Sequence, residues 1–256
     1  MSFLAVDIHQ KVFENGCLAV QNLKLSCQRG EFIAIVGPSG AGKSTLLNMV
    51  SGLDRDYAGS VTFAGQAFNP SAVRLGFLFQ ECRLLPWLTV YQNLQLVIKN
   101  APTAQPSKPL DVWLESVGLQ GCGGLFPGQL SGGMQRRVAL LRAFIVAPDV
   151  LLMDEPFQSL DAPTATQLRR LLHALWQQSA PTVLFVTHNL REAISVASRI
   201  VFLSARPSRV ILDYPMARSA ERAEAIDIDI ESDWVTQTHQ QILDRHPQLL
   251  SGLHLD

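Results

Sequence analysis

The sequence predicts an α/β fold in which a mostly parallel sheet is covered by helices on both faces, and three observations support this. Apolar runs typical of buried strands, such as EFIAIV, VLLMDEP and TVLFVTHN, alternate along the chain with segments that read as helices. Residues 37–45, GPSGAGKST, match the pattern G-x-x-x-x-G-K-S/T between one such strand and a helix. The chain has 256 residues, of which 47% are hydrophobic, and this is enough for a sizeable core.

The chain begins with two segments that are predicted to form a short antiparallel sheet, at residues 3–8 and 18–25, joined by a turn at 14–16. Phe13 stands just before this turn. Its side chain is either an ordinary core aromatic or a stacking face for a purine base. A buried strand at 31–36 follows and leads into the glycine-rich loop.

This loop is expected to bind nucleotide phosphates, because its glycines let several backbone N–H groups converge beside the positive end of the following helix. Lys43 would reach the β- and γ-phosphates, Ser44 would place its hydroxyl on magnesium, and Thr45 continues the start of the helix. The alternative is a chance glycine turn with a lysine, and the flanking strand and helix argue against it. The predicted phosphate-binding residues are Gly37, Pro38, Ser39, Gly40, Ala41, Gly42, Lys43, Ser44 and Thr45.

The segment after the loop contains a helix that should end near Ser51, a strand and turn at 61–65, and a buried strand at 75–80 that ends in Gln80. The end of such a strand points toward the crevice where open α/β sheets bind their ligands. A lone glutamine in this position carries little weight by itself.

Residues 81–147 read as a helical lobe inserted into the α/β core. Helices are expected at 89–100, where apolar residues recur with helical period, and more briefly at 111–119. A loop with three prolines separates them at 101–109. The sequence LSGGMQ then opens with a Ser-Gly-Gly turn and continues as a helix until Pro148.

The α/β pattern returns with a buried strand at 150–156, which carries the adjacent carboxylates Asp154 and Glu155. A helix with an apolar face follows, and the next buried strand, at 182–189, ends in His188. One more helix and two strands complete the sheet.

The predicted organisation is therefore a nucleotide-binding core at 1–80 and 148–215, the inserted lobe at 81–147, and a polar tail at 216–256. The tail is expected to hold one helix near 234–243, and the sequence assigns it no role.

Composition excludes several classes of function. The net charge of -1 gives no electrostatic footprint for nucleic acid. The four cysteines have irregular spacings and suggest neither a zinc site nor a disulfide framework. Asp7 and His9 come too early for a signal peptide, and no stretch of about 18 apolar residues is uninterrupted. Any work at a membrane would therefore require docking to another protein.

The order of the motifs is more specific than any one of them. The phosphate loop, Gln80, LSGGMQ at 130–135, VLLMDE, SLD at 159–161 and His188 follow one another along the chain. This order resembles the nucleotide-binding subunit of ABC transporters over roughly residues 3–215, and LSGG before an apolar helix is highly specific to that family. The resemblance implies a P-loop NTPase fold with a short antiparallel β subdomain and an inserted α-helical lobe.

The resemblance also implies a role for each site residue, with ATP and Mg²⁺ as ligands. Asp154 would hold magnesium through water, together with Ser44 and Gln80, and Gln80 would also sense the γ-phosphate. Glu155 resembles the general base that polarises the attacking water, and His188 the switch histidine that contacts the γ-phosphate. On residues alone, Glu155 could be a solvated acid before a proline and His188 a helix cap.

A second copy of the chain is also implied, because in this family the LSGG segment serves the ATP of the opposing protomer. The backbone N–H groups of this segment and the helix behind it form a second anion site. Asp161 resembles the aspartate that communicates across the dimer, and Phe13 falls where the family places an aromatic against adenine. The residues expected to act in trans are Ser131, Gly132, Gly133 and Met134.

Several positions depart from the family pattern. Met134 stands where many members have Gln, and the pair at 158–159 is Gln-Ser where Ser-Ala is common. Asn189 follows the histidine where Asp is usual, and the lobe is short around 101–109. The side chain at 134 is not the phosphate donor, so its change leaves activity intact, whereas the last two departures could alter coupling.

Two stretches, at 80–94 and 202–215, resemble the importer ATPases for nitrate, aliphatic sulfonates and taurine, and relatives that import thiamine-precursor pyrimidines. The implied partners are an integral membrane permease and, indirectly, a periplasmic or extracellular substrate-binding protein, with this chain peripheral at the cytoplasmic face of the inner membrane. The segment 81–98 is where the permease would dock, with Leu85, Pro86 and Trp87 on its surface. Alternatively, Leu85 and Trp87 belong to the core of the lobe.

Two other functions fit the phosphate loop less well. A soluble ABC-type ATPase of repair or translation usually has two cassettes or a long coiled coil, and this chain has one cassette and no heptads. A small-molecule kinase has no use for LSGG, His188 or the paired acids. The expected mechanism has two states: ATP closes the dimer, hydrolysis reopens it, and closure moves the lobes and the membrane partner.

Overall fold

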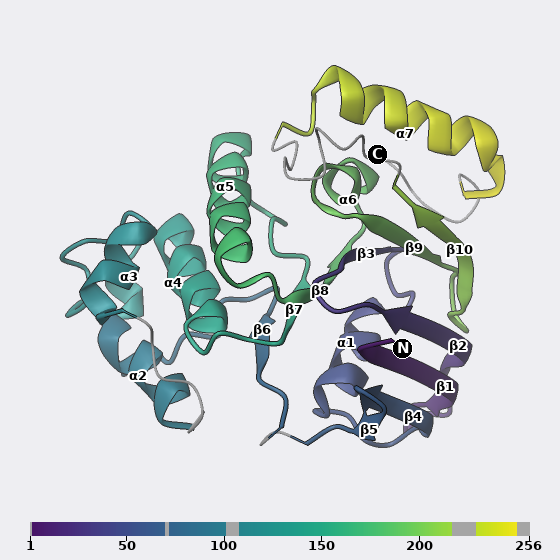
Figure 1. Cartoon of the computed structure of the whole chain (residues 1–256), viewed down its shortest axis with the longest axis horizontal. Coiled ribbons are helices and arrows are strands. Elements are labelled where there is room, and N and C mark those ends of the chain that lie inside the picture. The colour runs from purple at the N-terminus through teal and green to yellow at the C-terminus, as the bar shows by residue number, and fades with distance from the viewer. Residues whose placement is uncertain (1, 70–71, 101–107, 217–228, 250–256) are drawn as a thin grey trace. The chain divides into compact units, whose positions relative to one another are not determined.

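The structure is a computed structural model that describes residues 2–69, 72–100, 108–216 and 229–249 (Figure 1). The chain divides into two compact units. The first comprises Met1–Phe68, Met153–Glu155 and Thr182–Asp256, and the second Asn69–Leu152 and Pro156–Pro181. These bounds differ from the predicted core, lobe and tail, because 69–80, 148–152 and 156–181 group with the helices of the lobe. The division by function stays a prediction.

The first unit contains the antiparallel sheet predicted at its start. Both predicted strands are confirmed, and each is longer than expected. The turn between them is closed by a hydrogen bond of 2.9 Å from the Gly16 N–H to the Phe13 carbonyl. The strand order is β2-β1-β4-β5. The strands are β1 (Leu4–Val12), β2 (Leu18–Cys27), β4 (Ala58–Phe63) and β5 (Gln66–Ala67).

The same unit contains a second, mostly parallel sheet. Here β3 (Phe32–Val36) pairs in parallel with β8 (Thr182–Thr187) on one side and with β9 (Arg199–Leu203) on the other. β10 (Val210–Pro215) is antiparallel to β9. Every residue of β3 and β8 is buried, as expected for parallel strands covered on both faces. The predicted α/β class with a mostly parallel sheet and an antiparallel subdomain is confirmed.

Three helices of the first unit belong to this sheet. α1 (Lys43–Ser51) packs against β8, α6 (Leu190–Val196) packs against β3, and α7 (Asp233–Arg245) lies across α6 (Figure 1). α7 confirms the helix predicted in the tail and is followed by the short 3-10 helix η3 (Pro247–Leu249). The tail residues 217–228 lie outside the described residues.

The second unit is built around α4 (Gly132–Phe144), which contacts three other helices and β6 (Leu75–Leu78). Its residues 138–141 are buried. Residues Val150–Leu152 of β7 (Val150–Asp154), which neighbours β6, also belong to this unit. The remaining helices are α2 (Val90–Asn100), α3 (Leu110–Ser116), the 3-10 helix η1 (Pro127–Gln129) and α5 (Ala162–Ser179).

Two boundaries in this unit differ from the sequence expectation. β6 ends at Leu78, so Gln80 follows the strand by two residues and is not its last member. α4 ends at Phe144 and not at Pro148, because the residue before a proline disfavours helical geometry and Ala147 has already turned to a φ of 47°. The proline-rich loop at 101–107 lies outside the described residues. Within the described ranges, no helix has both the length and the apolar character needed to cross a bilayer.

The contact between α4 and β6 depends on Gly76. A β-carbon at this position would lie 2.4 Å from the Ala143 carbonyl oxygen and 3.1 Å from a Leu151 methyl group. Real β-carbons do not come that close to backbone oxygen, so the helix could approach the strand only because residue 76 has no side chain.

Gly76→Ala is therefore expected to destabilise the chain by about 1–3 kcal/mol, because the added methyl group must push α4 away from β6. Denaturant unfolding of the two proteins measures the difference. Gly124→Ala is the matched control, since a β-carbon there meets nothing within 4 Å. An equal midpoint for Gly76→Ala and the control would contradict this account of the packing.

Candidate functional site

The phosphate loop lies between the end of β3 and the first residue of α1. Gly40 and Gly42 have φ values of 76° and 85°, which residues with a side chain rarely adopt. A β-carbon on Gly37 would lie 3.2 Å from both Cβ and O of Leu203. The glycines of the motif are thus required by backbone conformation at two positions and by close packing at the third.

α1 begins at this loop without a side-chain cap, because its N-cap residue is Gly42. No acidic residue stands in its first turn, where Ser44 is exposed. The amides of a first turn have no partner within the helix, and the helix dipole adds partial positive charge there. The start of α1 is therefore suited to bind an anion.

Lys43 lies beneath the loop with only 5% of its side chain exposed. Its ammonium donates to the carbonyls of Gly37 at 2.8 Å and Pro38 at 3.0 Å, and it is 3.8 Å from Oε1 of Glu155. Burial lowers the pKa of Lys43, and the nearby charges of Glu155 and Asp154 act in the opposite direction. Two carbonyls and a carboxylate thus surround one buried cation.

Glu155 lies between Lys43 and His188. Its second oxygen, Oε2, is 2.9 Å from Nδ1 of His188, and 16% of its side chain is exposed. The backbone of Glu155 has a φ of 44°, which is strained for a residue with a side chain, and its N–H donates to the Val186 carbonyl of β8 at 2.9 Å. Such strain is often found at functional sites, and here it accompanies a carboxylate held by groups on both sides.

Asp154 ends β7 and is 8% exposed. Its carboxylate and the exposed hydroxyl of Ser44 are oxygen donors, the type of ligand that magnesium prefers. Ser44 and Asp154 therefore have the chemistry expected of magnesium ligands. The negative charge of Asp154 also raises the pKa of Lys43, against the effect of burial.

His188 directly follows β8, and the cap of α6 is Asn189. The Asn189 side-chain oxygen accepts from the N–H groups of Arg191 at 2.9 Å and Glu192 at 3.3 Å. His188 is therefore not the helix cap, and 46% of its side chain is exposed. Asn caps helices about as well as Asp, so this departure from the family pattern keeps the local geometry.

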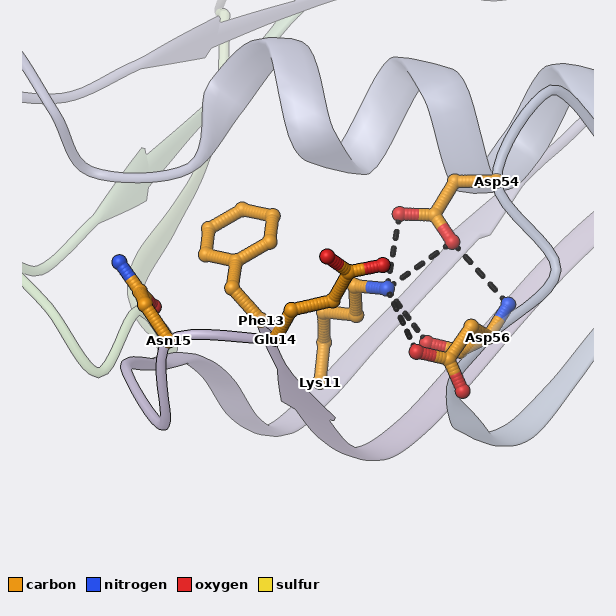
Figure 2. A pocket seen from close by; sticks show the side chains of 6 residues that line it. All are labelled: Lys11, Phe13, Glu14, Asn15, Asp54 and Asp56. Atoms are coloured by element: carbon orange, nitrogen blue, oxygen red, sulfur yellow. Dashed lines mark hydrogen bonds and ion pairs between the residues drawn. The ribbon is translucent and has the colours of Figure 1, made fainter.

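Phe13 is half-buried at the edge of a pocket of about 510 Å³ (Figure 2). Lys11 lies in this pocket with 5% of its side chain exposed and pairs with Asp54 at 3.0 Å and Asp56 at 3.4 Å. Its ammonium is 5.6 Å from the centre of the Phe13 ring. Lys11, Asp54 and Asp56 belong to no motif that would mark them in the sequence. The pocket is lined by Lys11, Phe13, Glu14, Asn15, Asp54 and Asp56.

The other predicted site residues lie in the second unit. Ser131 caps α4 and accepts from the Met134 N–H at 3.3 Å, and Asp161 caps α5 and accepts from the Thr164 N–H at 3.2 Å. Hydrogen bonds from the side chain and the backbone N–H of Thr164 lower the pKa of Asp161. A β-carbon on Gly133 would be 3.2 Å from a Thr164 methyl group, so the two helix starts lie next to each other.

Gln80 also lies in the second unit, where its amide donates to the side-chain oxygen of Gln158. Arg136 of α4 donates to the backbone carbonyl of Gln158 at 3.2 Å. The unusual residue at 158 therefore links Gln80 to α4, the helix that Ser131 caps. Sequence order alone could not reveal this link, because the three segments are far apart in the chain.

These features define the class of protein: a phosphate-loop nucleotide-binding cassette in which a second, helical unit carries the Ser-Gly-Gly turn at residues 131–133. The model of the ABC transporter family matches residues 20–158. The chain is 39% identical over 223 residues to the aliphatic sulfonates import ATP-binding protein SsuB of Bacillus licheniformis, covering 84% of this chain and 87% of that protein. The chain belongs to the ABC transporter family.

Two further proteins are similar. The nitrate import ATP-binding protein NrtD of Synechococcus elongatus is 40% identical over 235 residues, covering 88% of this chain and 86% of that protein. A dimeric ATP-binding cassette, solved in a post-hydrolysis state with ADP and Pi, has a TM-score of 0.71 at 28% identity and covers 84% of this chain and 100% of that one.

Asn189, the residue directly after His188, is the cap of α6, so removing its side chain should lower the stability of the chain measurably. Asn189→Ala is expected to lower the free energy of unfolding by about 1 kcal/mol, because two amides of the first turn lose their acceptor. Asn189→Asp should retain nearly all of it. Thermal unfolding of the three proteins tests this, and an unchanged midpoint for Asn189→Ala would show that the cap contributes nothing.

Proposed function

We propose that this chain is the ATP-hydrolysing subunit that energises a membrane ABC importer for a small anion or metabolite, such as a sulfonate, nitrate, taurine or a thiamine precursor. The observation that carries the ATPase function is the Glu155 carboxylate, held between Lys43 and His188 at the phosphate loop. The relatives named as sulfonate and nitrate import ATP-binding proteins favour an importer over a soluble ABC-type ATPase.

The phosphate loop binds the triphosphate of ATP. The Lys43 ammonium, which donates to the carbonyls of Gly37 and Pro38, has the charge and the position to transfer these hydrogen bonds to phosphate oxygens. Ser44, Asp154 and Gln80 are the residues that would hold Mg²⁺, which supplies positive charge to the β- and γ-phosphates.

Glu155 is the general base of the reaction. A carboxylate in this position accepts the proton of the water that attacks the γ-phosphate, and the strained backbone at Glu155 fixes where that oxygen lies. His188 contributes a partly exposed imidazole on the other side of the carboxylate, where it can contact the γ-phosphate and hold Glu155 in place. Gln80, in the second unit, has the proposed role of sensing the γ-phosphate.

A second copy of the chain completes each site. The start of α4 is exposed at Ser131 and Gly132, and the first amides of this 13-residue helix have no partner within it. Such a helix start binds phosphate of an opposing protomer, with Met134 in its first turn. Asp161, which caps the adjacent helix, communicates between the protomers. Similarity to solved dimeric cassettes supports this arrangement.

The membrane partner docks on the second unit. Trp87 has 69% of its surface exposed, which rules it out as a residue of the lobe core, whereas Leu85 is half-buried. Large exposed aromatics are frequent anchors at protein interfaces. The partner is an integral membrane permease, the chain is peripheral at the cytoplasmic face of the inner membrane, and the substrate-binding protein acts on it only through the permease.

Glu155→Gln tests the catalytic assignment and the dimer together. The change keeps the shape of the side chain but removes its basicity, so hydrolysis should fall about a hundredfold or more while ATP remains bound. With ATP and magnesium, the variant should then form a stable dimer. Light scattering after size exclusion measures the mass, and phosphate release measures the rate.

The wild-type chain with ADP is the control for this experiment and should remain a monomer. A Glu155→Gln protein that binds ATP but stays monomeric would contradict the shared sites, and unchanged hydrolysis would contradict the role of Glu155.

Trp87→Ala tests the docking surface. The variant should hydrolyse ATP as the wild type does when isolated, but bind its co-expressed permease about tenfold or more weakly, because a central anchor is lost. Co-purification from detergent-solubilised membranes measures this. Leu53→Ala, which removes another exposed apolar side chain (65% exposed) from the first unit, is the control. Equal recovery of permease with both variants would place the interface elsewhere.

A further inference from the structure

The loop at residues 204–209 joins β9 to β10 and has no role in the function proposed above. It is closed on itself, since Ser204 N–H donates to the Arg209 carbonyl at 3.0 Å and Arg209 N–H donates to the Ser204 hydroxyl at 3.1 Å. The loop is thus a compact element whose residues have fixed neighbours. Its sequence, SARPSR, is part of the second stretch that resembles nitrate and sulfonate importer ATPases.

This loop is bound to β2 and adjoins the phosphate loop. Ser208 donates its N–H to the Ala19 carbonyl at 2.9 Å and accepts from the Gln21 N–H at 3.1 Å. On the phosphate-loop side, a β-carbon on Gly42 would be 3.4 Å from the Ser208 hydroxyl. Leu203, at the end of β9, is the residue that a β-carbon on Gly37 would approach too closely. One short segment therefore lies against the phosphate loop at two of its glycines.

The same loop brings Arg206 to the turn that carries Phe13. The Arg206 guanidinium carbon is 5.8 Å from the centre of the Phe13 ring, and its Nη1 is 3.8 Å from Sγ of Cys17. The loop consequently connects the two places where a nucleotide is expected to bind, the phosphate loop and the aromatic ring. Arg206 is the residue of the loop that lies next to the aromatic ring.

Arg206 differs in one respect from Lys11, the other cation near this ring. Lys11 is buried, and its charge is balanced by Asp54 and Asp56 (Figure 2). Arg206 is exposed, and within the described part of the chain the acceptor found for its guanidinium is Cys17 Sγ, which is a weak one. Most of its N–H donors are therefore available to a ligand, whereas the ammonium of Lys11 is occupied by Asp54 and Asp56.

We propose that Arg206 binds the nucleotide base together with Phe13. A guanidinium is planar and stacks on aromatic rings, so an arginine beside a stacking phenylalanine gives the base a second flat and cationic partner. This inference rests on the proposed role of Phe13 and extends it: the base site consists of one aromatic ring and one arginine, and the compact loop holds the arginine in place.

The test compares ligands with and without a base. Arg206→Ala should weaken the binding of ADP about threefold to tenfold and leave the binding of inorganic pyrophosphate unchanged, because only the base contact is lost. Isothermal titration measures both affinities. Arg206→Lys, which keeps the charge but not the planar group, should recover part of the loss. Arg209→Ala, an exposed arginine of the same loop, is the matched control and should bind both ligands as the wild type does.

A double-mutant cycle with Phe13→Ala separates the two proposals. If both residues bind the base, adding Arg206→Ala to Phe13→Ala should reduce the affinity for ADP by a smaller factor than it does in the wild type.

A loss of ADP binding in Phe13→Ala but not in Arg206→Ala would overturn the role of Arg206 and keep that of Phe13. Unchanged ADP binding in Phe13→Ala would overturn both. An equal loss of ADP and pyrophosphate binding in Arg206→Ala would show a phosphate contact and overturn the base contact. Equal melting temperatures confirm that the variants are folded.

Discussion

The candidate site depends on the buried ammonium of Lys43 and the groups around it. A cation removed from water is stable only when several acceptors surround it, and here these are two loop carbonyls and the Glu155 carboxylate. The carbonyls require the glycine-rich path of the loop, and the carboxylate requires the end of β7 to lie beside that loop. Glu155 is in turn held by His188 from the end of β8. Three segments that are far apart in the sequence, the phosphate loop and the ends of β7 and β8, thus meet around one charge.

Much of this arrangement could be predicted from the sequence, because the signals are local. The phosphate loop is contiguous, and the apolar runs before Lys43, Asp154 and His188 are typical of buried parallel strands. Carboxyl ends of parallel strands meet at one edge of a sheet, so side chains that follow such strands are expected to come together. The α/β class and the short antiparallel sheet are likewise predictable, because apolar strand patterns and the turn at 14–16 are local signals. The roles proposed for Ser131 and Asp161 rest on the likeness of the motif order to that of the ABC transporter family, because the residues alone do not indicate them.

Other features depend on backbone irregularities that leave no pattern in the sequence. Regular alternation along β1 would leave Lys11 exposed, yet its side chain is buried and pairs with Asp54 and Asp56. The pairing of β1 is irregular on either side of Lys11, between Ile8 and Gln10 and between Lys11 and Val12. The positive φ of Glu155 is imposed by its neighbours and not by its residue type. The hydrogen bond between Gln80 and Gln158 joins two loops, and its existence depends on tertiary packing.

The glycine contact between α4 and β6 has a mechanical consequence for the second unit. A helix whose backbone touches a strand without intervening side chains cannot slide or tilt against it, because close-packed groups leave no room for adjustment. β6 leads within two residues to Gln80, and α4 starts beside Ser131. The position of Gln80 is therefore set by the same close contact that fixes the C-terminal end of α4.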